Sequence, residues 1–285
     1  MLGVVALTTF ATSCGGSSKT SSAEIPEETT TEAPSTTTSL VTTTSSSTTT
    51  TTTISGSVFV PLAPGSLSGK VIAIDPGHNG QNYAHSAEIA QQVNIGTKMK
   101  ECDTSGTSTN GGYSETAHNW DVSQRLSAIL RGAGATVVFT RPDDNGWGPC
   151  ITERAAIGNN AHADVALSIH ADGGPDAGTG FHVLYPALIA GMTEPIVEPS
   201  KRLAYAVRDA FATATGTTYA TYLGSQGLME RSDLGGLNLS KVPKVFIEAG
   251  NMRNAGDAAK LTDPAFRQKE AEGLATGIVK YLTGK

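Results

Sequence analysis

Short apolar runs, rich in β-branched residues, recur between helical patterns over the last 220 residues of the chain. They occupy residues 71–74, 135–140, 164–170, 180–185 and 244–248. Runs that are apolar almost throughout are typical of strands buried on both faces, as in parallel sheets. When strands alternate with helices, the helices cover both faces of such a sheet. The pattern therefore predicts a single α/β domain with three layers, α/β/α, around a mostly parallel, twisted sheet.

Four segments between or after these runs have the pattern of helices. Ser114 is a favoured capping residue, and Gly132 with Gly134 ends the helix that follows it. Three of the helices have an apolar face, formed by Val122, Leu126, Ile129 and Leu130, by Leu203, Ala206, Val207, Ala210 and Phe211, and by Leu274, Ile278 and Leu282. Residues 152–161 predict the remaining, short helix. The polar stretch 81–112 does not fit this alternation, so we interpret it as a long insertion that forms either a lid or a substrate-facing loop.

The first part of the chain differs in composition. Residues 15–65 are dominated by Ser and Thr and contain few large apolar side chains. Such a segment cannot bury enough apolar surface to offset the entropy that ordering costs, so we predict a disordered tether. The globular domain then spans residues 66–285, which is long enough for one sizeable core. The net charge of −6 and the lack of a basic cluster argue against a nucleic-acid partner.

Residues 1–14 resemble an export signal. The segment is mostly apolar, too short to span a bilayer, and ends in Ala11-Thr12-Ser13-Cys14. Small residues before a cysteine resemble the processing site of bacterial lipoproteins. We therefore expect a lipid anchor at Cys14 and a location at the extracytoplasmic face of the membrane or in the cell wall. A plain secretory signal or an apolar stub is the alternative, because no Lys or Arg precedes the apolar stretch.

Cys102 and Cys150 are the other two cysteines of the chain. An exported protein resides in an oxidising compartment, which favours a disulfide between them. The bridge would close a loop of roughly 49 residues and contribute about 4 kcal/mol in the chain-entropy model. Zinc ligation is the alternative, but neither cysteine belongs to a CxxC pair or lies near a histidine at ligand spacing. We therefore predict the disulfide.

Polar residues stand at the ends of three predicted strands. His78 follows the first strand, His170 ends the third and Glu248 ends the last. Because ligands and catalytic groups gather at the carboxyl ends of strands in α/β sheets, we expect these side chains to converge. Glu115 can join them from a helix N-terminus. Catalytic zinc takes three nitrogen or oxygen ligands and leaves one position for water, and a second carboxylate can then act as general base.

Each candidate residue also has a structural interpretation. His78 can cap a turn, and His170 can be a hydrogen-bonded residue at a strand end. Glu115 is favoured near a helix N-terminus by the helix dipole, whether or not a metal is bound. Glu248 can pair with Arg253.

Four motifs occur in order along the domain. They are Ile74-Asp-Pro-Gly-His78-Asn-Gly, Glu115-Thr-Ala-His-Asn119, Ser168-Ile-His170-Ala-Asp172 and Phe246-Ile-Glu248-Ala-Gly250-Asn-Met-Arg-Asn254. Together they resemble the zinc-dependent N-acetylmuramoyl-L-alanine amidases, from about residue 70 to residue 282. The resemblance implies that His78, Glu115 and His170 bind Zn²⁺ and that Glu248 is catalytic.

The chain departs from the family pattern beside these residues. Asn79 stands where the family usually has Gly, and Asp172 where it usually has Asn. Ala249 and Gly250 follow the catalytic Glu in place of Gly-Phe, and the insertion 81–112 is longer than in the family. None of these departures removes a ligand.

Other polar residues of the domain are assigned lesser roles. We do not expect metal binding by His85, His118, His162 or His182. Asp75 is expected either to shape the turn or to orient His78 by accepting its hydrogen bond. Asp172 is a similar candidate for a residue that supports a metal ligand without binding the metal.

The resemblance implies a reaction and a substrate. The amide between the lactyl group of N-acetylmuramic acid and L-alanine of the stem peptide would be hydrolysed, in peptidoglycan or in muropeptide fragments, for cell-wall remodelling or recycling. We expect a monomer with zinc as its cofactor. Two other classes stay open: a non-catalytic peptidoglycan-binding module, and a zinc peptidase that acts within the stem peptide.

Overall fold

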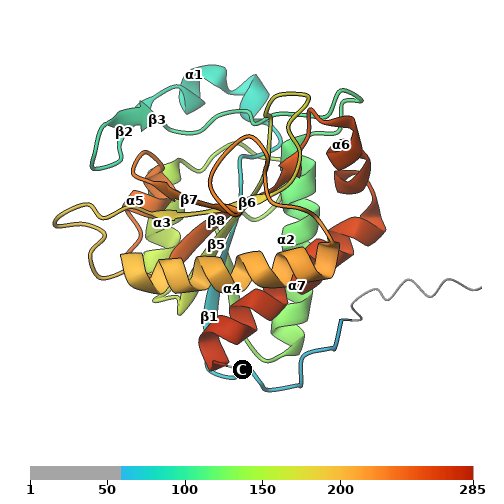
Figure 1. The fold of residues 1–285 in the computed structure, drawn as a ribbon. Coiled ribbons are helices and arrows are strands. Elements are labelled where there is room, and N and C mark those ends of the chain that lie inside the picture. Colours follow the sequence, from blue (N-terminus) through green and yellow to red (C-terminus); the bar gives the residue numbers. More distant parts are fainter. Residues whose placement is uncertain (1–58, 285) are drawn as a thin grey trace, which may run out of the picture. The chain divides into compact units, whose positions relative to one another are not determined.

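The structure is a computed structural model that describes residues 59–284 of the 285-residue chain (Figure 1). The predicted leader 1–14 with Cys14, and the predicted tether as far as residue 58, lie outside the described residues. Over the part of the chain that is described, no helix combines the length and the apolar character needed to cross a membrane.

Six strands form the central sheet, in the order β4-β1-β5-β8-β6-β7. Their bounds are Val71–Pro76 (β1), Thr136–Phe139 (β4), Val165–Asp172 (β5), His182–Pro186 (β6), Leu228–Arg231 (β7) and Lys244–Asn251 (β8). Each neighbouring pair is parallel except β6 and β8, which run antiparallel. The predicted α/β fold with a mostly parallel sheet is confirmed, although β7 was not predicted.

One face of the sheet carries the main apolar core. Alternate residues such as Ile74, Leu167 and Ile247 are fully buried there. The helices that pack on this face are α2 (Glu115–Gly132), α4 (Val197–Thr215) and α7 (Pro264–Thr283). This layer contains three of the four predicted helices.

The opposite face is lined by small and polar side chains. Ala73 and Ala166 pack there against Gly158 of α3 (Ile151–Asn160), the fourth predicted helix. A second helix on this side, α5 (Gly235–Asn238), was not predicted, and neither was α6 (Ala255–Leu261), which follows β8. The polar residues of this face continue toward the carboxyl ends of the strands, where the candidate site lies.

Helix α2 begins where the sequence predicts. The hydroxyl of Ser114 accepts a hydrogen bond from the backbone N–H of Ala117, which satisfies one of the free donors of the first turn. Glu115 is therefore the first residue of the helix. Past the other end, Gly134 adopts a φ of +93°, a conformation that favours glycine.

The insertion 81–112 contains regular structure that the sequence pattern did not reveal. Its elements are a 3₁₀ turn η1 (Asn82–Ala84), helix α1 (Ser86–Ile89) and an antiparallel hairpin of β2 (Gln92–Asn94) and β3 (Met99–Glu101). The predicted disulfide between Cys102 and Cys150 is confirmed, and it ties the end of the hairpin to the start of α3.

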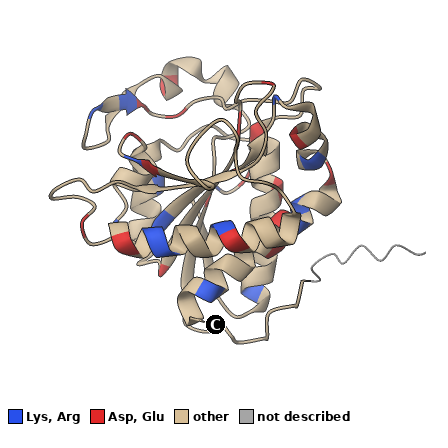
Figure 2. Cartoon of the chain, in the orientation of Figure 1, with Lys and Arg blue, Asp and Glu red and all other residues tan. Residues whose placement is uncertain are grey.

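Charged residues are mixed on the face shown in Figure 2. Basic and acidic residues are interspersed along the helices there, without a broad stretch of one sign.

Candidate metal centre

Three strand ends and one helix start meet at a single place. His78 lies two residues beyond β1, His170 lies in the last part of β5, and Glu248 is its register partner on β8. Glu115 arrives from the first turn of α2. The structure thus brings together all four residues that the sequence singled out.

The donor atoms of three of them converge. Glu115 Oε1 lies 2.8 Å from His170 Nδ1 and 3.4 Å from His78 Nε2. One donor atom from each of these residues lies within 4.8 Å of the others. The three side chains are nearly buried, and the two imidazole rings meet edge to face. Two imidazole nitrogens and one carboxylate oxygen are the ligand set of several catalytic zinc sites, so the residues present fit a zinc ion.

The backbone of His78 is strained. Its φ of 57° lies in the left-handed region, which is uncommon for residues other than glycine. This conformation follows the sharp turn after β1. Strained residues of this kind cluster at functional sites.

The acceptor for His78 is not the predicted one. His78 Nδ1 lies 3.0 Å from Asp103 Oδ1 and 2.9 Å from the carbonyl oxygen of Thr104, both in the insertion. Asp75 does not contact His78, so that alternative of the prediction was wrong. The carboxylate of Asp75 points instead to the polar face of the sheet, where it accepts hydrogen bonds from Thr140, Arg154, Ser168 and Lys244.

The insertion also holds Glu115 in place. The backbone N–H of Thr107 donates to Glu115 Oε2 over 2.9 Å. Oε1 faces the two histidines and also accepts from the backbone N–H of Ala171 at 3.3 Å and from Asn119 Nδ2 at 3.4 Å. Gly106 passes so close that a Cβ atom there would lie 2.8 Å from the same Oε2. A side chain at position 106 would therefore displace the ligand.

The charges of the site act on one another strongly. Burial lowers the pKa of His78, but the carboxylates of Glu115 and Asp103 outweigh it and raise that pKa to about 10. Burial would raise the pKa of Glu115, but His78 and His170 hold it well below its ordinary value. Burial lowers the pKa of His170, with Glu115 opposing. A metal cation and a proton therefore compete for this group of donors.

Glu248 stands beside the three donors without a partner of its own. Its Oε2 is buried and accepts no hydrogen bond, and no ion pair links it to Arg253 among the described residues. Burial, reinforced by Glu115 and Asp172, raises the pKa of Glu248 well above its ordinary value. A bound cation would offset part of that repulsion. A free carboxylate oxygen next to a metal site is suited to exchange protons with water.

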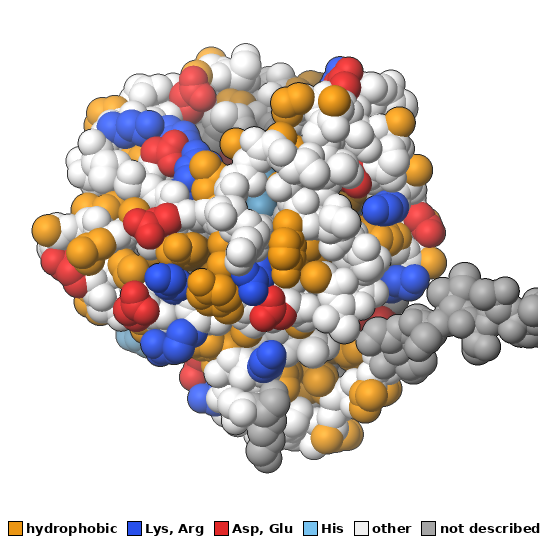
Figure 3. All heavy atoms as spheres, viewed as in Figure 1, with side chains coloured by type: hydrophobic (Ala, Val, Ile, Leu, Met, Phe, Trp, Pro, Cys, Tyr) orange, Lys and Arg blue, Asp and Glu red, His pale blue; other side chains and the backbone are white. Residues whose placement is uncertain are grey.

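A cavity of about 350 Å³ opens at this site and runs along the polar face of the sheet. Its walls include Lys100 and Thr104 of the insertion, Leu234 and Leu237 at α5, and Phe246 of β8. The insertion thus faces the cavity, as expected for the substrate-facing loop that was one of its two predicted roles. On the face shown in Figure 3, histidine side chains are visible only as small areas, which agrees with their burial.

The remaining histidines lie outside the cluster of donors. His118 is fully buried and lies 2.9 Å from Glu270, and His85 contacts Glu88. His182 is buried on β6 as the register partner of Glu248, and its Nδ1 has no hydrogen-bond partner. Among the described residues, His78, Glu115 and His170 form the one group of this kind that could hold a metal.

Asp103 is the residue of the site that the sequence analysis missed. It lies in the insertion, where no periodic pattern marks it. The only available signal was its position directly after Cys102, because the disulfide fixes the backbone there.

Comparisons with known proteins agree with this geometry. The family model described as N-acetylmuramoyl-L-alanine amidase (Amidase_3) matches residues 72–280. N-acetylmuramoyl-L-alanine amidase Rv3717 of Mycobacterium tuberculosis is 42% identical over 220 residues, which are 77% of this chain and 89% of that protein.

Solved structures give the same result. The amidase Ami1 of Mycobacterium smegmatis matches with a TM-score of 0.71 and 42% identity, over 77% of this chain and 99% of that one. Ami1 of Mycobacterium abscessus matches with a TM-score of 0.71 and 45% identity, over 76% of this chain and 100% of that one. With the converging histidines and glutamates, these matches show that the chain belongs to the Amidase_3 family of N-acetylmuramoyl-L-alanine amidases.

Proposed function

We propose that this protein hydrolyses the amide bond between N-acetylmuramic acid and L-alanine in peptidoglycan, with Zn²⁺ as its cofactor. Membership of the amidase family supports the reaction. The observation that carries the proposal is the convergence of His78, Glu115 and His170, with the unpaired carboxylate of Glu248 beside them. The alternative of a non-catalytic binding module would not require a buried Glu248 Oε2 without a hydrogen-bond partner.

The three donors are proposed to hold the metal through His78 Nε2, Glu115 Oε1 and His170 Nδ1. These are the atoms that face one another. His78 is already bonded to Asp103 through its other nitrogen. When bound, Zn²⁺ supplies Lewis acidity toward the scissile carbonyl and toward water.

Glu248 is proposed to move the proton. Its Oε2 accepts a proton from the attacking water and then delivers it to the nitrogen of the departing L-alanine. The raised pKa of Glu248 makes its carboxylate a stronger base toward the water than that of an exposed glutamate. The cavity beside it gives a substrate access from the insertion side.

Digestion of purified peptidoglycan tests this function. The full chain, loaded with Zn²⁺, is incubated with intact polymer and separately with soluble muropeptides, and the new chain ends are identified by mass spectrometry. We expect free muramic lactyl carboxylates and stem peptides that begin with L-alanine. New ends within the stem peptide would identify a peptidase instead, and binding without new ends would identify a binding module.

The remaining assignments concern the setting of this activity. We propose a monomer that acts outside the cytoplasm, with residues 1–14 as a leader, residues 15–65 as a tether and residues 66–285 as the catalytic domain. Lipidation of Cys14 would place the domain at the membrane surface. The family supports the extracytoplasmic setting, since peptidoglycan lies there.

A further inference from the structure

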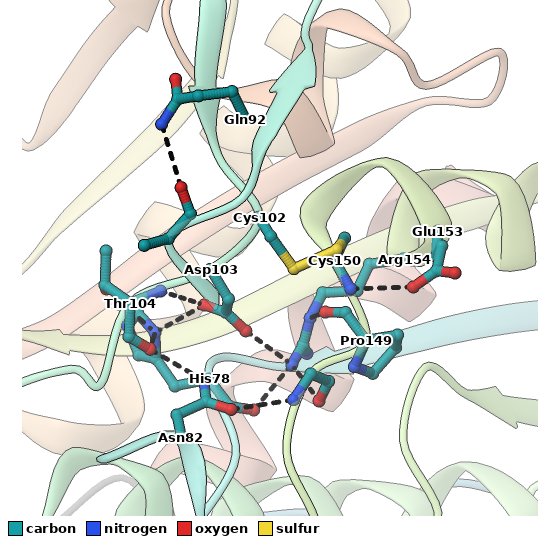
Figure 4. The surroundings of a disulfide bond; sticks show 12 residues. His78, Asn82, Gln92, Cys102, Asp103, Thr104, Pro149, Cys150, Glu153 and Arg154 are labelled. Carbon is teal, nitrogen blue, oxygen red and sulfur yellow. Dashed lines mark hydrogen bonds and ion pairs between the residues drawn. A yellow bond between two sulfur atoms is a disulfide. The ribbon is translucent and has the colours of Figure 1, made fainter. Parts of the chain in front are cut away.

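The insertion is joined to helix α3 at two adjacent positions. Cys102 is bonded to Cys150, and the next residue, Asp103, forms an ion pair with Arg154, one helical turn after Cys150 (Figure 4). The covalent link and the ionic link thus connect the same two segments. The two residues of the ion pair also contact His78: Asp103 through its ring and Arg154 through its carbonyl oxygen.

The carboxylate of Asp103 is fully engaged. Its Oδ1 lies 3.0 Å from His78 Nδ1 and accepts the backbone N–H of Thr104 at 2.8 Å. Its Oδ2 accepts a hydrogen bond from Arg154 Nη2 at 3.1 Å. Asp103 is 6% exposed. A buried carboxylate with all of these partners has a fixed position, so it also fixes the ring of His78.

The orientation of His78 matters for the metal. With Nδ1–H donated to Asp103 and to the carbonyl of Thr104, the imidazole presents Nε2, which is the nitrogen that faces Glu115. Partners of this kind set the tautomer and the direction of a ligating histidine. Asp103 therefore acts on the metal through His78 and has no contact with the other two donors.

The disulfide is the covalent link in the set of contacts that hold the segment of Asp103. The hairpin β2–β3 forms a two-stranded sheet of its own and does not join the central sheet. Backbone hydrogen bonds link Cys102 to Gln91 and to Ile151, and Asp103 to Ile89. Two of these three bonds stay within the insertion. The links from this segment to α3 are therefore the Ile151–Cys102 backbone bond, the ion pair of Asp103 with Arg154, and the disulfide, which is the covalent one.

We propose that Asp103 is a positioning residue of the metal site and that the Cys102–Cys150 disulfide holds it there, so that the oxidation state of the disulfide sets the metal affinity. The inference rests on the proposed function, because it presupposes the metal at His78. A dithiol reductant supplies two electrons and two protons, is itself oxidised to a disulfide, and leaves two cysteine thiols. Residue Cys150 is partly exposed, whereas Cys102 is buried. Attack is therefore expected at the sulfur of Cys150.

The test measures zinc affinity by competition with a chromophoric chelator, on the full chain, without any assay of hydrolysis. Asp103→Ala is expected to bind Zn²⁺ roughly 10- to 100-fold more weakly than the wild type. Asp103→Asn, which keeps an oxygen acceptor for His78, is expected to recover most of that loss. Asp121→Asn is the matched control, because Asp121, like Asp103, pairs with arginine but contacts no proposed ligand.

The disulfide is tested by the double variant Cys102→Ser/Cys150→Ser, which avoids thiol reductants that themselves bind zinc. We expect the double variant to bind zinc more weakly than the wild type. Asp103→Ala should have a smaller effect on zinc affinity in this background than in the wild type, since both changes weaken the same contact between Asp103 and His78. Circular dichroism at the temperature of the assay establishes that the variants are folded. If the double variant does not fold, the comparison of Asp103→Ala with Asp103→Asn and Asp121→Asn decides the positioning role alone.

The outcomes separate the inference from the proposed function. A wild type that binds no zinc would refute the proposed cofactor. Zinc binding by Asp103→Ala at wild-type affinity would overturn the positioning role, while the cofactor would stand. A folded double variant with wild-type affinity would overturn the role of the disulfide.

Discussion

At the scale of single residues, Glu248 is the sharpest case. It is the register partner of His170 and lies in the same cavity as the three donors, and its Oε2 has no hydrogen-bond partner. We predict that Glu248→Gln retains the fold and about one bound zinc but loses turnover by roughly three orders of magnitude, since general acid–base catalysis contributes about 10²–10⁴-fold. Elemental analysis and peptidoglycan digestion check the two parts. Near-normal digestion would remove Glu248 from the reaction.

His170→Ala should behave in the opposite way. The substitution removes one of the three donors, so we predict that the purified variant loses most of its zinc and, with it, its activity. Elemental analysis of protein dialysed against a weak chelator is the measurement. Full zinc occupancy in this variant would exclude His170 from the coordination shell.

His182 supplies a prediction about pH. Burial is the main reason that its pKa falls to about 4 from the ordinary value of 6.5. The unfolded chain then binds more protons than the folded one between these values, so stability decreases as the pH falls through that window. His182→Leu should reduce the loss of unfolding free energy between pH 7 and pH 5 by about 2 kcal/mol. Urea titrations at both pH values measure it. Equal losses in the two proteins would contradict the prediction.

The sequence predicted residues of the site where their position relative to a strand indicated where their side chains would lie. His78 follows β1, and His170 and Glu248 lie in the last parts of β5 and β8. The carboxyl ends of parallel strands converge at one edge of a sheet. Asp103 follows no such rule, since its approach to His78 depends on the path of an irregular segment. The same reasoning misassigned Asp75, because nearness in sequence to His78 was read as nearness of the two side chains.

At the scale of elements, Asp75 connects four of them. From β1 it accepts hydrogen bonds from Arg154 of α3, Ser168 of β5 and Lys244 of β8, and from Thr140 just after β4. Lys244 and Arg154 are buried. Asp75→Asn would leave Lys244 without its ion-pair partner and Arg154 with Asp103 alone, so we predict a loss of about 3 kcal/mol in unfolding free energy. Asp164→Asn, which removes an exposed pair with Lys70, should cost less than about 1 kcal/mol.

The same carboxylate predicts sensitivity to acid. Burial would raise the pKa of Asp75, but Lys244 and Arg154 outweigh it and hold the pKa far below the ordinary value. A depressed pKa adds stability that is present above about pH 4 and lost as the pH falls further. Urea titrations from pH 5 to pH 2 should therefore show a steeper loss for the wild type than for Asp75→Asn. Parallel curves would show that Asp75 is not the source.

The elements that were missed are short. Strand β7 has four residues without an apolar run, and α5 has four residues of which two are glycine. Hairpin β2–β3 pairs three residues with three. Hydrophobic periodicity can be recognised only over longer segments than these. The apolar runs of β1, β5 and β8, by contrast, predicted the strands at the centre of the sheet.

At the scale of the whole molecule, the open question is where the domain acts. Cys14 follows small residues, as lipoprotein processing requires. Two acyl chains give stable membrane anchoring where one does not. We predict that the wild type, expressed with a functional leader, partitions with membranes. Cys14→Ser should move to the soluble extracytoplasmic fraction with unchanged hydrolysis of muropeptides. A wild type found in the soluble fraction would refute the anchor.

The left-handed backbone of His78 lowers the stability of the fold at a residue that is proposed to bind the metal. A residue other than glycine held in such a conformation costs about 1–3 kcal/mol, and here that residue is a proposed metal ligand. A library of this protein selected for heat resistance alone would tend to replace His78 with glycine or asparagine, which accept the turn more readily. Engineers who want a more durable enzyme should therefore keep position 78 fixed and look for gains elsewhere in the fold.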